Sequence, residues 1–249
     1  MTALDGLVVL VAGIAAGTIN AVVGSGTLIT FPTLLALGYA PVVANVSNTV
    51  GLVPGALSGA HGYRRELTGQ AGRLARLGAA SALGGATGAV LLLVLPASAF
   101  NAIVPVLIAL ACVLVVLQPR LVARLRARDV PRPLHGGPWL WLGVFGSGIY
   151  GGYFGAAQGV LLIALLGLGL DEGLQRVNAA KNVLAGLVNG VAAVLFVVVA
   201  DVAWPPALLL AAGSLAGGQL GARVGRRLPD VVLRVVVIAV GIVAIVKLL

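Results

Sequence analysis

One lysine stands inside a long apolar stretch of this chain and is the residue best placed to do chemistry. Lys181 lies between Asn178 and Asn182, near the start of an apolar segment that runs from 177 to 199. Hydrocarbon disfavours an unpaired charge, so an ionisable residue within such a segment indicates a functional site. An ammonium group carries a full positive charge and donates three hydrogen bonds. Lys181 therefore predicts a site for an anion.

Amide side chains and two glycine-rich turns accompany Lys181. Each amide can donate two hydrogen bonds, which suits an oxyanion with several acceptor oxygens. Glycines let the backbone turn and approach a ligand, and a helix that restarts after the turn offers unpaired N–H groups and a positive dipole end, a geometry that binds anions. The predicted substrate-binding residues are Lys181, Asn178, Asn182, Asn45, Asn48, Asn20, Gly24, Ser25, Gly26, Thr27, Gly155, Gln158 and Gly159.

These residues also have structural interpretations, which the sequence leaves open. Lys181 alternatively extends its ammonium group to the membrane surface, because its segment begins near that surface. The asparagines at the segment starts alternatively cap the helices that follow. Asn20 and Asn189 alternatively join neighbouring helices by hydrogen bonds.

The composition indicates a membrane protein. The chain has 249 residues, of which 60% are hydrophobic and 9% charged, and its mean hydropathy is +1.11. Its apolar runs are continuous, as in membrane-spanning helices, whereas a β-barrel would show short alternating segments. The net charge of +9 does not indicate nucleic-acid binding, because the basic residues fall between apolar segments. We predict an all-α polytopic membrane protein.

Ten apolar segments follow one another along the chain. They lie at 6–22, 25–38, 42–60, 74–95, 99–117, 139–154, 157–170, 177–199, 206–222 and 231–248. The second and seventh are shorter than the roughly 20 residues that a full span needs, so we predict half-helices or broken pieces there. The membrane is then crossed by eight to ten segments.

The arginines gather in alternate breaks between these segments. These breaks are 61–76, 119–138, 171–176 and 223–230. If each segment crosses the membrane once, all four lie on one side, which the positive-inside rule assigns to the cytoplasm. Both termini then face outward. If the two short segments are re-entrant, a common side requires compensating changes elsewhere.

An internal repeat relates the two halves of the chain. The motif at 81–89 recurs at 214–222, and the motif at 45–48 recurs at 178–181, both at an offset of 133 residues. The glycines at 84, 88, 217 and 221 have the spacing of helix-packing faces, which is a more common use of such glycines than ligand contact. Two motifs kept at one offset favour a duplicated structural unit.

The two repeats must run in opposite directions across the bilayer, because each contains five segments, an odd number. Inverted repeats are typical of secondary transporters, whose binding site lies near the midplane where the repeats meet. We therefore predict a first transmembrane repeat at 1–120, a basic cytoplasmic linker at 121–138 and a second repeat at 139–249.

The sequence contains no arrangement typical of an enzyme or a metal site. Cys112 is the single cysteine, and no Cys/His cluster accompanies it. No Asp or Glu lies deep in an apolar segment, which argues against a metal-cation site. A phosphate-binding G-x-x-x-x-G-K-[ST] loop does not occur. We expect no enzymatic activity, no cofactor and no bound metal.

Several motifs together resemble the sulfite exporter TauE/SafE-like family of bacterial membrane permeases, over essentially the whole chain. They are Gly17-x-x-Asn20-x-x-x-Gly24-Ser25-Gly26-Thr27-Leu28-x-x-x-Pro32, Ala44-Asn45-x-x-Asn48-Thr49, Tyr150-Gly151-Gly152-Tyr153-Phe154-Gly155-x-x-x-Gly159 and Asn178-x-x-Lys181-Asn182. The resemblance implies transport of small anions, often sulfite, sulfonates or sulfoacetate, across the inner membrane. In such proteins the second glycine turn often reads G-x-G-x-G, but here Ala157 holds the middle position.

Taken together, these features predict a permease that carries a small sulfur oxyanion or organosulfonate by alternating access. Its partners would be the anionic substrate and the lipid bilayer, without nucleic acid. A coupling H⁺ or Na⁺ and an oligomeric state stay open. The alternatives are a passive anion channel and a non-transporting membrane subunit that assists another complex.

Overall fold

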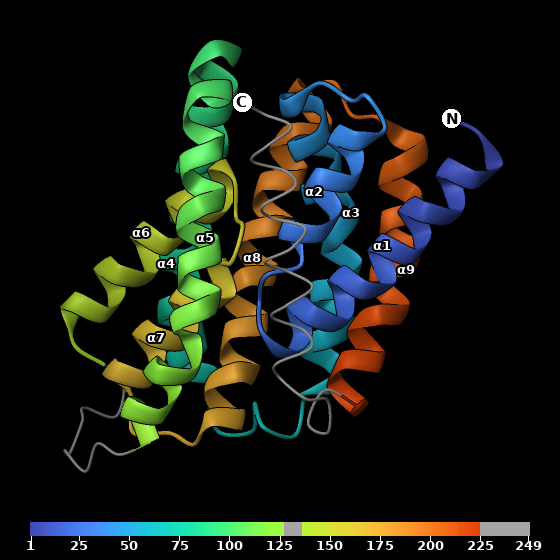
Figure 1. The fold of residues 1–249 in the computed structure, drawn as a ribbon. Helices are drawn as coiled ribbons and strands as arrows, with labels where there is room; N and C mark the ends of the chain where they lie inside the picture. Colours follow the sequence, from blue (N-terminus) through green and yellow to red (C-terminus); the bar gives the residue numbers. More distant parts are fainter. Residues whose placement is uncertain (127–135, 225–249) are drawn as a thin grey trace.

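The described part of the chain is a bundle of helices (Figure 1). The computed structural model describes residues 1–126 and 136–224, and within these ranges it contains no strand. The helices are α1 (Ala3–Val22), α2 (Thr27–Ala36), α3 (Pro41–Gly62), α4 (Ala71–Val94), α5 (Ala97–Arg126), α6 (Pro138–Tyr153), α7 (Gln158–Gly169), α8 (Leu174–Val199) and α9 (Trp204–Val224). The all-α prediction is confirmed.

Four of the described helices are long and apolar enough to span a membrane. They are α1, α4, the part of α5 from Ala97 to Gln118, and α8. The predicted segments match the helices within about three residues, except that α5 continues to Arg126. Hydropathy marks the bilayer boundary, whereas Arg, Leu and Ala still favour a helix beyond it. The predicted tenth segment, 231–248, and linker residues 127–135 lie outside the described residues.

The two short segments form hairpins with the helices that precede them. At about 1.5 Å per residue, the 10 residues of α2 and 12 of α7 cover roughly half of the ~30 Å hydrocarbon core. The end of α2 returns to the start of α1, where the Tyr39 hydroxyl lies 4.0 Å from the Met1 sulfur. The end of α7 returns to the start of α6, where Gly169 lies against Leu140. Each hairpin thus enters and leaves at one face.

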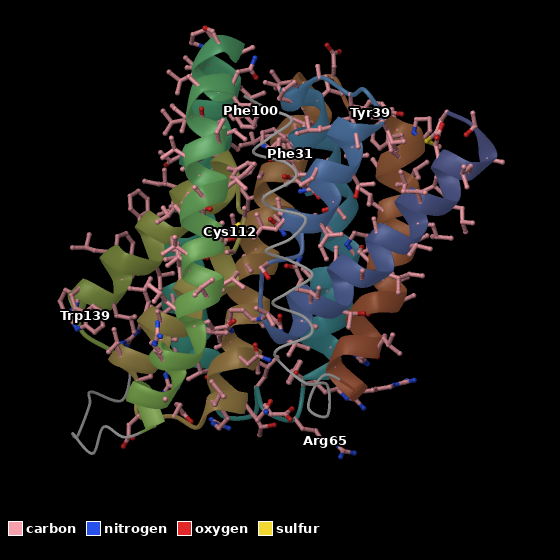
Figure 2. The ribbon with its side chains drawn as sticks, viewed as in Figure 1. Phe31, Tyr39, Arg65, Phe100, Cys112 and Trp139 are labelled. Carbon is pink, nitrogen blue, oxygen red and sulfur yellow. The ribbon has the colours of Figure 1, made fainter. Side chains whose placement is uncertain are left out.

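The described arginine-bearing connections meet at one end of the bundle. Glu172, in the α7–α8 connection, pairs with Arg73 at the start of α4, and Arg176 donates to the Thr68 carbonyl. Figure 2 shows Arg65 at this end and Tyr39 at the opposite one. Because each hairpin returns to its own face, the short helices do not change the side on which these connections lie. We call this end the arginine face.

Small residues interlock helices from the two halves of the chain. A Cβ on Gly217 of α9 would overlap the carbonyl oxygen of Ile14 in α1, and a Cβ on Gly84 of α4 would overlap that of Phe145 in α6. These glycines are therefore helix-packing faces, as their spacing predicts. Helices α1 and α3 pack on α9, and α4 packs on α6 and α8. The two halves are intertwined rather than separate bodies.

Hydrogen bonds between the halves occur at positions that the repeat relates to each other. The Ser214 hydroxyl donates to the Gly51 carbonyl at 2.8 Å, and the Ser81 hydroxyl donates to the Leu184 carbonyl at 3.0 Å. Donors and acceptors are both 133 residues apart. A duplicated unit requires this reciprocity, and the inverted repeat itself stays a prediction.

Adding one methyl group should have opposite effects at two glycines. Gly217→Ala should lower the free energy of unfolding by about 1–3 kcal/mol, because the new Cβ overlaps the α1 backbone. Gly146 of α6 is exposed, and its Cβ would meet nothing within 4 Å. Gly146→Ala should therefore stabilise the protein by about 0.5–1 kcal/mol through helix propensity. Unfolding in detergent measures both; equal shifts would contradict the assigned packing.

Candidate functional site

The tips of the two hairpins meet in the interior of the bundle. Gly24 has a φ of +87° and Gly155 a φ of +77°, left-handed values that favour glycine. The Gly159 amide donates to the Gly24 carbonyl at 3.1 Å. A Cβ on Gly24 would overlap the Gly159 backbone, and a Cβ on Gly159 would overlap the Gly24 backbone. The two glycine turns predicted from the sequence are therefore brought into direct contact.

Lys181 is fully buried beside these tips, with 0% of its surface exposed. Its Nζ donates to the carbonyls of Asn20 at 2.7 Å and Ala21 at 3.3 Å, at the C-terminal end of α1. Helix C-termini carry unpaired carbonyls and the negative end of the dipole, which favour a cation. The side chain points inward and does not extend to the membrane surface. Two of the three ammonium protons are engaged, which leaves one for a ligand.

Asn178 and Asn182 flank Lys181 and bind the same helix end. Their Nδ2 groups donate to the Ala21 carbonyl at 3.0 Å and 3.2 Å. The motif on α8 thus caps the end of α1, instead of capping its own helix. The Asn178 Oδ1 is buried and has no hydrogen-bond partner. These three residues hold the α1–α2 hairpin against α8.

The two asparagines of the first half tie α3 to other elements. The Asn45 Nδ2 donates to the Tyr153 carbonyl at the end of α6, at 2.9 Å. Asn48 accepts a hydrogen bond from the Thr30 hydroxyl and donates to Thr27 at 3.4 Å, both in α2. Both asparagines are buried, with 1% exposed. They fix the positions of the hairpins rather than face Lys181.

Two backbone amides of the glycine turns, those of Gly26 and Gly159, are already paired. The Gly26 amide donates to the Asn20 Oδ1 at 2.6 Å, and the Gly159 amide donates to the Gly24 carbonyl. Ser25 is buried, and its hydroxyl has no hydrogen-bond partner. An anion that used these amides would first have to displace their present partners.

A small cavity of about 30 Å³ lies beside the ammonium group. One water molecule needs roughly 10–15 Å³ of such space, so the cavity has room for about two water molecules. It is lined by Asn20, Ala21, Gly24, Thr27, Gly55, Ala56, Gly155, Gln158, Gly159, Lys181, Asn182, Ala185 and Asn189. The predicted residues that do not line it are Asn45, Asn48, Asn178, Ser25 and Gly26.

Three neutral donors face this cavity together with Lys181. Asn20 uses its Oδ1 for Gly26, which leaves its Nδ2. The Thr27 hydroxyl accepts from Asn48 and keeps its own proton. Asn189 also lines the cavity and is absent from the predicted set. It stands eight residues after Lys181, a spacing that puts both on one face of α8, so helical periodicity was the signal for it.

Gln158 and Gly155 also line the cavity. The Gln158 Nε2 donates to the Ser147 carbonyl at 3.1 Å, and its side chain fills the space beside Gly151. Within residues 1–126 and 136–224, no group of three His, Cys, Asp or Glu could hold a metal ion. The groups that contact the Lys181 ammonium are carbonyls rather than carboxylates. The cavity is therefore suited to an anion.

Ala157, at the middle of the second glycine turn, adopts a backbone conformation that favours glycine. Its φ is +58° in the left-handed region, and the residue is fully buried as the N-cap of α7. A residue with a Cβ pays about 1–2 kcal/mol for this conformation. The turn therefore adopts this shape with alanine rather than glycine at its middle position.

An ion cluster closes the arginine face below the site. The Glu172 carboxylate lies 2.8 Å from the Arg73 Nη1 and 2.5 Å from the Arg176 Nε. Burial raises the pKa of Glu172, but hydrogen bonds and charges from Arg176 and Arg73 outweigh it and hold this pKa below its ordinary value. The cluster joins the α7–α8 connection to the start of α4, and so links the two halves.

Comparison with known proteins gives a consistent assignment. The family model described as "Sulfite exporter TauE/SafE" matches residues 9–248. The chain is 26% identical over 242 residues to the "Probable membrane transporter protein YfcA" of Escherichia coli (strain K12), covering 94% of this chain and 86% of that protein. It is 28% identical over 218 residues to a "Probable membrane transporter protein" of Haemophilus influenzae, covering 85% and 81%. No solved structure matches the chain.

Replacing Ala157 with glycine should stabilise the protein. Glycine adopts the left-handed conformation without the Cβ penalty, so Ala157→Gly should raise the free energy of unfolding by about 1 kcal/mol. Ala156 is also fully buried, but its φ is not in the left-handed region. Ala156→Gly is the control and should destabilise. Thermal unfolding compares the two, and a lower midpoint for Ala157→Gly would contradict the strain.

The Glu172 cluster should stabilise the protein only while the carboxylate is charged. A carboxyl whose pKa is lowered on folding contributes stability above its unfolded pKa, here about 4.5, and loses it as the pH falls through its folded pKa. Glu172→Gln should therefore cost about 1 kcal/mol at pH 7, and the difference from wild type should shrink below pH 4.5. Asp171→Asn, at an exposed position in the same connection, controls for the loss of one negative charge. A pH-independent difference would refute an electrostatic origin.

Proposed function

The chain belongs to the sulfite exporter TauE/SafE family, and we propose that it is a permease for a small anion at the Lys181 cavity. Membership of this family makes it a multi-pass membrane protein of a transporter family. The proposal adds the substrate class, the site and the mechanism. The substrate would be a sulfur oxyanion or organosulfonate such as sulfite or sulfoacetate, and the membrane would be the bacterial inner membrane with the arginine face toward the cytoplasm.

The observation that carries the proposal is a buried ammonium group whose described contacts are neutral carbonyls. A buried charge without an opposite charge is costly, so an anion that reaches it gains strongly. The remaining ammonium proton and the donors of Asn20, Thr27 and Asn189 converge on one small space. Oxyanions with three or more acceptor oxygens match such a set of donors.

Alternating access follows from a competition for Lys181. An arriving anion competes with the Asn20 and Ala21 carbonyls for the ammonium protons. Its binding would release the hydrogen bonds from Lys181 to the end of α1, which Asn178, Asn182 and the packing on α9 would still contact. The α1–α2 hairpin could move, and the present cavity is too small for a substrate without such movement. Inverted repeats that rock around a shared site would open it to each side in turn.

The reciprocal packing of α1 on α9 and of α4 on α6 supports the two inverted repeats, 1–120 and 139–249. The first hairpin enters from the face opposite the arginines and the second from the arginine face, as inverted topology requires (Figure 1).

A passive channel with the same site would carry anions without saturation or counter-flow. A non-transporting subunit would carry none alone. The coupling ion and oligomeric state would be settled by the same flux measurements and by sizing the purified protein.

Flux in proteoliposomes tests the site directly. Lys181→Ala should lower uptake of sulfite or sulfoacetate by about 10- to 100-fold, the loss expected for a hydrogen bond to a charged group. Asn189→Ala should lower it about 2- to 10-fold, because one neutral donor is lost. The Asn189 side chain makes no hydrogen bond among those described, so this variant should fold normally.

Asn101→Ala is the matched control, because Asn101 is exposed on α5, away from the cavity. Its flux should equal that of wild type. Thermal unfolding of each variant separates loss of transport from loss of folding. Undiminished flux in a folded Lys181→Ala protein would refute the assignment of the site, and absence of flux in wild type would favour the non-transporting subunit.

A further inference from the structure

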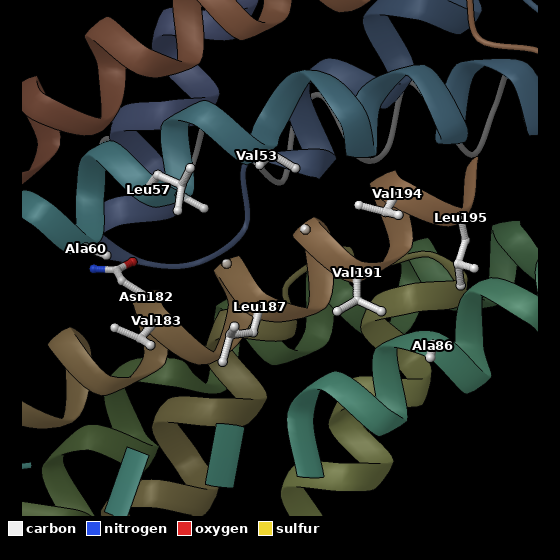
Figure 3. A pocket seen from close by; sticks show the side chains of 13 residues that line it. Val53, Leu57, Ala60, Ala86, Asn182, Val183, Leu187, Val191, Val194 and Leu195 are labelled. Atoms are coloured by element: carbon white, nitrogen blue, oxygen red, sulfur yellow. The ribbon is translucent and has the colours of Figure 1, made fainter. Parts of the chain in front are cut away.

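A second, larger hollow adjoins the Lys181 cavity, and transport of an inorganic ion would not require it. It has a volume of about 550 Å³ and lies between α3, α4 and α8. Figure 3 shows Val53 and Leu57 of α3 on one side, Val191 and Val194 of α8 on another, and Ala86 of α4. Asn182 is its single polar lining residue. We call it the apolar groove.

The groove and the cavity adjoin each other. Asn182 and Ala56 line both, so the polar end of the groove is the edge of the space that holds the ammonium group. At its other end the groove reaches the outer surface, where Leu57 is 63% and Val194 66% exposed. In a membrane-spanning bundle these side chains face the hydrocarbon. Asn182 and Ala56 thus lie between the buried positive charge and a groove that reaches the apolar surface.

The chemistry along this path selects an amphiphilic ligand. A ligand held by one charge at one end and by apolar side chains along its length must carry one anionic group on a hydrocarbon body. The volume lies within the range of pockets that bind small organic molecules. A bare sulfite ion would be too small to fill the groove and has no hydrocarbon to contact its apolar walls. A doubly charged dicarboxylate would bury its second charge unpaired.

We infer that the apolar groove is the subsite for the hydrocarbon part of a single-chain organic anion, whose charged head is bound at Lys181. The inference rests on the proposed function, because it takes the Lys181 cavity as the anion site. It narrows the substrate class to alkyl sulfonates and similar anions with an unbranched apolar chain. It also gives such a substrate a lateral route between the site and the bilayer.

A chain-length series measures the groove directly. We would titrate the full-length protein in nanodiscs with sulfite, methanesulfonate, butanesulfonate and hexanesulfonate and follow thermal stabilisation, which reports the Kd. In wild type the Kd should fall about fourfold for each added methylene that is buried. Sulfite has no hydrocarbon, so its binding tests the proposed function alone.

Gly190 offers a variant that fills the groove. It lines the groove, and a Cβ there would meet nothing within 4 Å, so Gly190→Leu should fold and occupy the space of the ligand chain. This variant should bind sulfite and methanesulfonate as wild type does but lose the gain with chain length. Gly146→Leu, equally unobstructed but outside the groove, controls for partitioning into the bilayer and should keep the gain.

The outcomes distinguish a failure of the groove inference from a failure of the proposed function. If sulfite and methanesulfonate bind but the Kd does not fall with chain length in wild type, or falls equally in Gly190→Leu, the groove is not the subsite. A phospholipid that co-purifies with wild type but not with Gly190→Leu, together with a flat series, would assign the groove to a lipid tail and overturn the inference. If no anion in the series binds, the proposed function fails first.

Discussion

The ammonium group of Lys181 must find acceptors inside an apolar bundle, and the unpaired carbonyls at the end of α1 must find donors there. Each group meets the need of the other, with Nζ bound to the Asn20 and Ala21 carbonyls. Either group alone would be costly to bury. This contact holds the end of α1 in the interior, where the chain turns back as a hairpin. In the proposed mechanism, the same contact connects the binding charge to the hairpin that moves.

Glycine makes this arrangement sterically possible at two levels. At the centre, Gly24 and Gly159 touch through their backbones, which brings the two hairpin tips beside the lysine. Around the centre, Gly217 and Gly84 let helices of opposite halves cross at backbone distance. Close crossings give each half a firm hold on the other, because van der Waals contact and hydrogen bonds hold helices together where hydrophobic burial cannot. The two halves differ at the repeat position of Lys181, where the first half has Asn48, which does not line the cavity.

The free-energy cost of burying a charge also explains where the charged side chains lie. The Glu172 cluster sits at the arginine face, where water can still solvate it, whereas the single described cation inside the bundle has carbonyl partners. In the proposed function, a site with one positive charge and neutral donors would bind an anion and also release it. Release is as important as binding for a transporter, because a fully paired buried charge would hold its ligand too firmly to cycle.

The sequence by itself determined the class of fold and most helix limits, and it singled out Lys181 as a charge inside an apolar segment. Hydropathy periods and the penalty for buried charge are local properties, so they can be read from residues in order. The tertiary structure alone decided which donors meet. It gave Asn178 and Asn182 to the end of α1, turned Asn45 and Asn48 toward other helices, and brought Asn189 to the cavity. An amide has several possible partners of similar strength, and only the packing of distant segments selects one.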